Sequence, residues 1–416
     1  MLLPHVERKI WRITWDISAI RRQFPLLAQP GLVYLDAAAT TPLPESVLEA
    51  TAAFEKTMRS NVHRGLYPLA EAATVAYENA RQRVAEWIGA KSHEVIFTKN
   101  GTEALNLIAH SWGSEHLTKK DTILISLLEH HSNVVPWFQA QKQTQCHIDW
   151  IPCDDHGDLD LEAYRASLAK NQVKCVALTG QSNVLGVRPP IKDMIRAAHD
   201  AGAIVVIDAC QLAAHAPIDV AALDADFLFF TGHKVYGPTG IGVVYGKRKL
   251  LEAMPPFLGG GMMIREVKRD GFTPADIPQK FEAGTPPIAA AVGLDAALQW
   301  QQQFAWPDRV AHERTLIEAA LKHLGMIKHL RLLGPGNADE QFGCVSFVVD
   351  NVHPHDIAEI AGRAGVCLRA GHHCTQPLHE HLGVNATARL SVGIYNTVDE
   401  VKRAATIIES AVQRLS

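Results

Sequence analysis

The sequence has 416 residues, of which 47% are hydrophobic and 20% charged, with a formal net charge of −4. Such a composition is ordinary for a globular protein, and the length suggests two or three domains. Lys and Arg form no block, so neither a nucleic-acid nor an anionic-membrane partner is expected. The seven cysteines are irregularly spaced, which argues against a disulfide framework. Because charges interrupt the apolar N-terminus and no apolar run is long enough to span a bilayer, we expect a cytoplasmic protein.

Short apolar runs alternate with helical patterns from about residue 94 onward. Seven runs are predicted to be strands: 94–98, 122–126, 147–151, 175–179, 203–208, 226–231 and 240–245. Most lack polar–apolar alternation, as expected for strands that are buried on both faces. Helices are predicted over 102–111 and 191–201, with Gly202 ending the second. This alternation predicts an α/β unit with a large, mostly parallel sheet.

The pattern changes after Pro286-Pro287 and predicts a smaller α+β unit. Helices are expected over 289–303, from Pro307 to about 322, near 355–364 and from 398, with strands at 344–350, 367–371 and 386–392. The predicted domains are 28–288 for the large unit, and 1–27 with 289–416 for the small one. Residues 16–27 are expected to pack against the small unit, whereas residues 1–15 carry no motif.

Polar residues follow several predicted strands, and ligands collect at the carboxyl ends of strands in open α/β sheets. Asp208 ends one predicted strand, and Lys234 follows the next. A pyridoxal phosphate (PLP) enzyme needs a lysine to hold the aldehyde and a carboxylate to keep the pyridine nitrogen protonated. Alone, Asp208 is as well explained as a helix N-cap, and Lys234 as a solvated residue. Gly101-Thr102 could bind a phosphate or simply begin a helix.

Cys374 lies between Gly371 and Pro377, which predicts a loop. Adjacent histidines and Arg369 could stabilise the thiolate, which is the nucleophilic form. A zinc site is the main alternative, although the spacing fits no standard pattern. Its ligands would come from His372, His373, Cys374, His379 and His381. A buried, inert role suits Cys344 and Cys367 better than Cys374, because those two cysteines lie in apolar runs.

Seven motifs occur in register over nearly the whole chain. They are YLDAAATT (34–41), NVHRG (61–65), EHHSNVVPW (129–137), SNVLG (182–186), TGHKVYGPTGIG (231–242), EAGTPP (282–287) and RAGHHCTQP (369–377). Together they resemble the class V aminotransferases, which are fold type I PLP enzymes, and within them the group II cysteine desulfurases of the SufS and CsdA type. The resemblance implies a large, mostly parallel-sheet domain with a smaller α+β domain, and a homodimer.

The resemblance also implies how PLP would be held. Lys234 would form the Schiff base and later move the Cα proton, Asp208 would pair with the pyridine nitrogen, and His130 would stack on the ring. Gln211 would contact the ring oxygen, with Asn183 near that oxygen and the substrate carboxylate. The phosphate would be bound by Thr102, Thr231 and His233, and by Thr285 acting on the partner subunit's cofactor. The sequence DACQ (208–211) departs from the usual DGAQ and places Cys210 near the cofactor, where we interpret it as a packing residue.

For the substrate, the resemblance implies that Arg389 clamps the carboxylate of L-cysteine, with Arg369 close by. Cys374 would accept the sulfur as a persulfide and leave L-alanine. A sulfur-acceptor protein, typically in iron–sulfur cluster assembly, is then expected. Three alternatives stay open at this stage: a selenocysteine lyase on the same scaffold, another PLP reaction such as transamination, and a non-catalytic sulfur-carrier or metal-binding protein.

Overall fold

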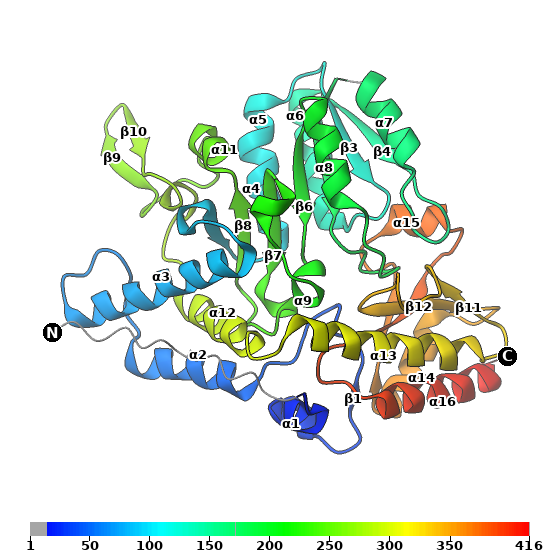
Figure 1. The fold of residues 1–416 in the computed structure, drawn as a ribbon. Helices are drawn as coiled ribbons and strands as arrows, with labels where there is room; N and C mark the ends of the chain where they lie inside the picture. The colour runs from blue at the N-terminus through cyan, green and yellow to red at the C-terminus, as the bar shows by residue number, and fades with distance from the viewer. Residues whose placement is uncertain (1–14, 171, 416) are drawn as a thin grey trace.

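The computed structural model describes residues 15–170 and 172–415. Most of the segment 1–15, for which the sequence suggests no motif, lies outside the described residues. The larger of the two main sheets contains all seven predicted strands (Figure 1). These are β2 (Val95–Thr98), β3 (Thr122–Ser126), β4 (His147–Ile151), β5 (Val173–Thr179), β6 (Ile204–Asp208), β7 (Phe227–Thr231) and β8 (Gly242–Gly246).

The strand order in this sheet is β2-β8-β7-β6-β5-β3-β4. Strand β8 runs antiparallel to both of its neighbours, and the remaining pairs are parallel. The prediction of a largely parallel sheet is therefore confirmed. As a consequence, the carboxyl ends of β3, β5, β6 and β7 meet at one edge, and β2 ends there too because it is antiparallel to β8.

Helices cover both faces of the large sheet, which explains its continuous apolar strands. One face packs against α3 (Pro68–Ile88), α7 (Leu161–Lys170), α8 (Ile191–Asp200) and α12 (Ile288–Gln301), and the other against α4 (Gly101–Leu107) and α6 (Val135–Thr144). Every residue of β3, β7 and β8 is accordingly buried, whereas the edge strand β4 alternates in exposure. The predicted helix 102–111 is confirmed as α4, which continues into a π-helical turn, Ile108–Trp112.

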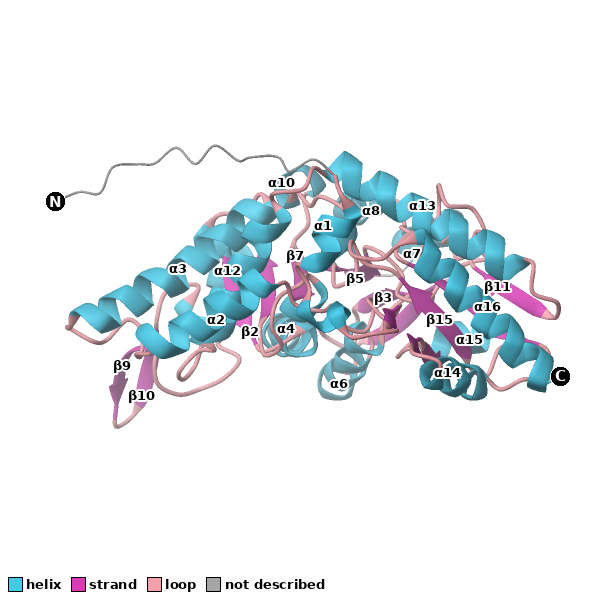
Figure 2. Cartoon of the chain, turned by 90° about the horizontal axis from the view of Figure 1, so that it is seen from below, coloured by secondary structure: helices cyan, strands magenta, loops and turns pink. Residues whose placement is uncertain are grey.

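The smaller sheet is antiparallel, in the order β11-β12-β15-β14. Its strands are β11 (Leu330–Leu333), β12 (Cys344–Val349), β15 (Thr387–Ser391) and β14 (Arg369–Gly371). Three helices, α13 (Trp306–Gly325), α14 (Pro354–Arg363) and α16 (Val398–Leu415), bury a common apolar cluster with it (Figure 2). The predicted strand 367–371 is split in two, because β13 (Val366–Cys367) leaves this sheet and pairs with β1 (Val33–Tyr34).

An aromatic cluster joins the N-terminal segment to elements of both sheets. After α1 (Ile17–Arg22), the Phe24 ring lies 5.3 Å from Trp300 of α12, 5.0 Å from Tyr395 and 6.0 Å from Tyr236. Residues 16–27 therefore contact the loop after β7 as well as the smaller unit that the sequence predicted. The domain boundary near residue 288 stays a prediction.

Two features were not anticipated from the sequence. Helix α2 (Glu45–Thr57) lies beside α3 and α12, and Figures 1 and 2 show the three together. A hairpin of β9 (Ile264–Lys268) and β10 (Gly271–Pro274) projects from the body (Figure 1). In the part of the chain that the structure describes, no helix combines the length and apolar character needed to cross a membrane.

Candidate active site

Several of the predicted site residues lie at the carboxyl ends of the strands of the large sheet. Asp208 ends β6, and Lys234 closes a short 3-10 turn directly after β7. His130 follows β3, and Asn183 follows β5. All predicted site residues but one line a single pocket at this edge: Thr102, His130, Asn183, Asp208, Gln211, Thr231, His233, Lys234, Arg369, Cys374 and Arg389.

Asp208 presents a buried carboxylate to this pocket. It is 4% exposed, and its Oδ1 accepts a 2.8 Å hydrogen bond from the backbone N–H of Cys210. Burial raises the pKa of Asp208, although this N–H and the charge of Lys234 act in the opposite direction. Because a buried carboxylate is stabilised by a nearby cation, the site suits a protonated pyridine nitrogen. The chemistry of this donor set therefore fits PLP.

Two histidines of the pocket are neutral. Burial, followed by the charge of Lys234, lowers the pKa of His130 to about 3 and that of His233 to about 4. Nδ1 of His130 accepts a 3.1 Å hydrogen bond from the backbone N–H of Ser132, which leaves the ring proton on Nε2. A neutral imidazole can stack on a cofactor ring without adding a second positive charge beside Lys234.

The first turn of α4 forms another part of the pocket lining. Oδ1 of Asn100 caps the helix by accepting a 2.9 Å hydrogen bond from the N–H of Glu103. The N–H groups of Gly101 and Thr102 have no acceptor within the helix, as in any first turn, and so can face an anion. A Cβ on Gly101 would lie 2.8 Å from Sγ of Cys210. Cys210 thus packs tightly under this turn, which supports its interpretation as a packing residue.

Arg389 lies on β15, opposite Arg369 of β14. It is 2% exposed; its Nη1 donates to the carbonyl of Asn183 at 2.8 Å, and its Nη2 lies 3.2 Å from Oδ1 of Asp36. Among the described residues its Nε has no hydrogen-bond partner. Burial raises the pKa of Asp36 and lowers that of Arg389, so desolvation outweighs their attraction. This guanidinium retains capacity for a carboxylate ligand.

Cys374 is the exposed member of the cysteine set, and all seven thiols are free. It lies on the loop between β14 and α15 (Gln376–His381). Cys344 is buried, as expected, whereas Cys367 is only partly buried. Within the described residues, no group of three or more His, Cys, Asp or Glu side chains is arranged to hold a metal ion. A thiol at the mouth of the pocket can react with a bound substrate.

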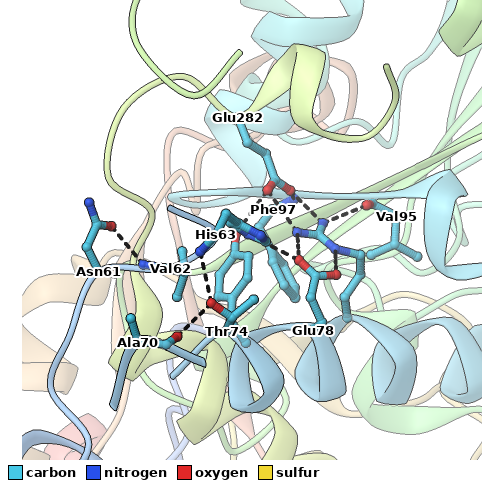
Figure 3. Close-up of polar contacts among 11 residues, drawn as sticks. Asn61, Val62, His63, Ala70, Thr74, Glu78, Val95, Phe97 and Glu282 are labelled. Atoms are coloured by element: carbon cyan, nitrogen blue, oxygen red, sulfur yellow. Dashed lines mark hydrogen bonds and ion pairs between the residues drawn. The ribbon is translucent and has the colours of Figure 1, made fainter. Parts of the chain in front are cut away.

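Thr285 is the predicted residue that does not line this pocket. It lies with Asn61 in a surface groove between α2 and α12. Two motifs, EAGTPP and NVHRG, meet near this groove around the buried Arg81, and Figure 3 shows Glu282 of the first motif and His63 of the second. Arg81 pairs with Glu282 of EAGTPP at 2.6 Å and with Glu78 at 2.9 Å. Glu78 in turn lies 3.4 Å from Nε2 of His63, in NVHRG.

Several residues with a direct place in the site were not singled out by the sequence. Asp36 pairs with Arg389, and Ser132 bonds to the ring of His130. His131 hydrogen-bonds to the Cys374 loop, where its backbone N–H reaches the Cys374 carbonyl at 2.6 Å. Each lies inside a motif that was noted, YLDAAATT or EHHSNVVPW. The motifs therefore contain these residues, but the residues that they contact are distant in the sequence.

A family model for the class-V aminotransferases matches residues 33–404. This match, over a fold with a large parallel sheet and a pocket at its carboxyl edge, places the chain in the class-V aminotransferase family, whose members depend on PLP.

The relatives narrow this assignment. The chain is 45% identical over 405 residues to a probable cysteine desulfurase of Vibrio cholerae, covering 96% of this chain and 99% of the relative. It is 44% identical to a probable cysteine desulfurase of Streptomyces coelicolor, with 93% and 94% covered. The crystal structure of the cysteine desulfurase CsdA from Escherichia coli matches with a TM-score of 0.90 at 38% identity, covering 97% of this chain and all of that one. Within the class-V aminotransferases, the chain belongs to the cysteine desulfurases.

Proposed function

We propose that this protein is a PLP-dependent cysteine desulfurase that converts L-cysteine to L-alanine and retains the sulfur as a persulfide on Cys374. One observation carries the proposal: an exposed cysteine on a loop shares a pocket with Lys234, Asp208 and a buried arginine. Transamination would use the lysine and the aspartate equally well, but it gives Cys374 no task. The relatives named above support the same reaction.

The residues of the pocket divide between cofactor and substrate. Lys234 would hold PLP through its aldehyde, with Asp208 at the ring nitrogen and His130 on the ring face. Bound PLP supplies an electron sink for the bonds at Cα and Cβ of the substrate. Arg389, through a guanidinium that is free at Nε, would bind the substrate carboxylate in a fixed orientation. The amine of Lys234 would move the Cα proton.

The sulfur transfer balances without an added oxidant or reductant. The C–S bond of cysteine breaks, and an S–S bond forms between that sulfur and the Cys374 thiolate. The electron pair of the C–S bond remains with Cβ, which takes up a proton to become the methyl group of alanine. Both sulfur atoms end partly oxidised, and Cβ is correspondingly reduced. Water takes no part in this transfer. The loop therefore needs only to bring the Cys374 thiolate close to the sulfur of the bound substrate.

Alanine formation tests this proposal. Wild-type protein with bound cofactor should form alanine from L-cysteine in the presence of dithiothreitol, which releases the persulfide as sulfide. Cys374→Ser should keep the yellow colour of the cofactor and lose alanine formation, whereas Lys234→Ala should lose the colour that borohydride reduction removes from wild type. Alanine formation by Cys374→Ser at the wild-type rate would disprove the role of Cys374. A colourless wild type that shows no gain on adding PLP would disprove the cofactor.

The homodimer, in which Thr285 reaches the partner subunit's cofactor, belongs to the same proposal. Its support is the exposed position of Thr285 in a groove away from this chain's own pocket. A cytoplasmic location, and a protein that accepts the sulfur for iron–sulfur cluster assembly, likewise stay predictions. Equilibrium sedimentation of the holoprotein tests the dimer: a monomer with full cofactor content would contradict it.

A further inference from the structure

The backbone around Cys374 adopts a conformation that its own residues disfavour. His373 and Cys374 are consecutive non-glycine residues with φ of +48° and +59°, and Gly371 has φ of +128°. Left-handed backbone at such residues is costly and persists only where surrounding contacts hold it. The position of the Cys374 thiol therefore depends on groups outside the loop.

Two residues from the large sheet supply these contacts. Nδ2 of Asn183 donates a 2.8 Å hydrogen bond to the carbonyl of His373. His131 makes two contacts with the loop, both on the C-terminal side of the Cys374 side chain. Its backbone N–H donates to the Cys374 carbonyl at 2.6 Å, and its Nε2 accepts from the N–H of Gln376 at 3.0 Å. Asn183, on the N-terminal side, and His131, on the C-terminal side, thus hold the backbone around Cys374.

The residue before His131 links these contacts to the pocket. His130, the preceding residue, lines the pocket at the proposed ring face. A single peptide link therefore connects the residue against the cofactor with the residue that holds the nucleophile loop. Because the link is planar and stiff, it keeps the residue that holds the Cys374 loop close to His130 in the pocket.

We propose that His131 is a positioning residue that holds the Cys374 loop for sulfur transfer, through the acceptor atom Nε2 of its neutral imidazole. The inference rests on the proposed desulfurase function. The hydrogen bond from Gln376 requires Nε2 to be unprotonated, and burial and the nearby His372 lower the pKa of His131 in the direction that keeps it so. His131 contacts neither cofactor nor substrate in this assignment, so its effect is exerted through Cys374.

Two variants separate the acceptor from the bulk of the ring. In His131→Gln, the side-chain oxygen can take the place of Nε2, whereas His131→Leu fills similar space without an acceptor. His147→Leu, at an exposed position on β4, is a matched histidine control. All four proteins are compared as holoenzymes with equal cofactor absorbance, so a loss of folding or of cofactor is detected separately.

The decisive readout compares L-cysteine with L-selenocysteine, both with dithiothreitol present. Selenium leaves carbon more easily than sulfur and dithiothreitol reduces it to selenide, so that reaction does not need the Cys374 thiolate. We expect His131→Leu to lower kcat for L-cysteine about 10- to 100-fold, as a displacement of about 1 Å does, with KM and selenocysteine turnover within about 3-fold of wild type. His131→Gln and His147→Leu should stay within about 3-fold of wild type on both substrates.

Three results would overturn the inference while the proposed function stands: wild-type turnover of L-cysteine by His131→Leu, an equal loss on both substrates, or a His131→Gln variant as impaired as His131→Leu. The second result would indicate general damage to the pocket, and the third would show that the acceptor atom is irrelevant. Wild-type protein that turns over selenocysteine but forms no alanine from L-cysteine would instead refute the desulfurase proposal itself, and this inference with it.

Discussion

The Arg81–Glu282 pair offers a stability prediction whose size follows from the burial of both side chains. The two side chains are 1% and 8% exposed, and two guanidinium nitrogens of Arg81 bind the two carboxylate oxygens of Glu282 at 2.6 and 2.9 Å. The same carboxylate accepts the backbone N–H of Phe97 at 2.7 Å and the hydroxyl of Tyr77 at 3.0 Å. Replacing Glu282 with Gln would leave the Arg81 charge buried.

Removing one partner of a buried pair costs about 3–5 kcal/mol. The lower end applies to Glu282→Gln, because Glu78 still neutralises part of the Arg81 charge and the amide oxygen can still accept from Phe97. At about 2.1 cal/mol/K per residue, the unfolding entropy of a chain this long is about 0.9 kcal/mol/K. A loss of about 3 kcal/mol then lowers Tm by about 3–4 °C.

Calorimetric unfolding of the holoprotein measures this shift, at matched protein concentration and cofactor content because both affect Tm. Glu359→Gln is the control, since its pair with Arg363 is exposed by 61% and 79% and is worth less than about 1 kcal/mol. Its Tm should fall by no more than about 1 °C. Equal decreases in Tm for the two variants would refute the reasoning that burial makes the Arg81–Glu282 pair more stabilising than an exposed pair.

Three further predictions concern charges in and behind the pocket. Burial lowers the pKa of His130 to about 3 and that of His373 to about 2. As the pH falls below 6.5, the unfolded chain therefore protonates these histidines before the folded protein does. The free energy of unfolding then drops by about 1.4 kcal/mol per pH unit for each histidine. His130→Gln should remove its share of that slope in urea unfolding between pH 6 and 4.5, and an unchanged slope would contradict the assignment. Burial raises the pKa of Glu129 to about 8, so its folded form keeps a proton that the unfolded chain loses above pH 4.5, and stability falls as pH rises toward 8. Glu129→Gln should gain on wild type over that window, and a constant difference between pH 5 and 8 would show otherwise. Arg389→Lys keeps the positive charge but loses the two-pronged donor, so kcat/KM for L-cysteine should fall about 10- to 100-fold in steady-state alanine assays. An unchanged kcat/KM would mean that another group binds the substrate carboxylate.

Most of the large sheet could be predicted from the sequence because its signals are local. Uninterrupted apolar runs indicate strands that are covered on both faces, and all seven runs are strands in the structure. The prediction of one strand over 367–371 is wrong, since nothing in its composition reveals that Cys367 pairs with β1 while Arg369 pairs with β15. That split depends on a strand more than 300 residues away.

The residues of the candidate active site could be predicted from the sequence to a similar extent. Residues that end strands, such as Asp208 and Thr231, are brought together by the rule that parallel strands finish at one edge. The contacts between His131 and Cys374, and between Asp36 and Arg389, could not be obtained in this way. They join segments 243 and 353 residues apart, and they depend on how the smaller sheet packs against the larger one.

The sequence by itself therefore determined the strands of the large sheet, the lysine and aspartate at their ends, and a cysteine on a loop. All three can be predicted from local patterns of apolar residues and from turn-forming residues. Only the tertiary structure decided that eleven of the predicted site residues share one pocket, that Thr285 lies in a separate groove, and that His131 and Asn183 hydrogen-bond to the Cys374 loop. The physical reason is that a side chain's partners across the fold are chosen by the packing of whole elements, and that packing is a property of the assembled chain.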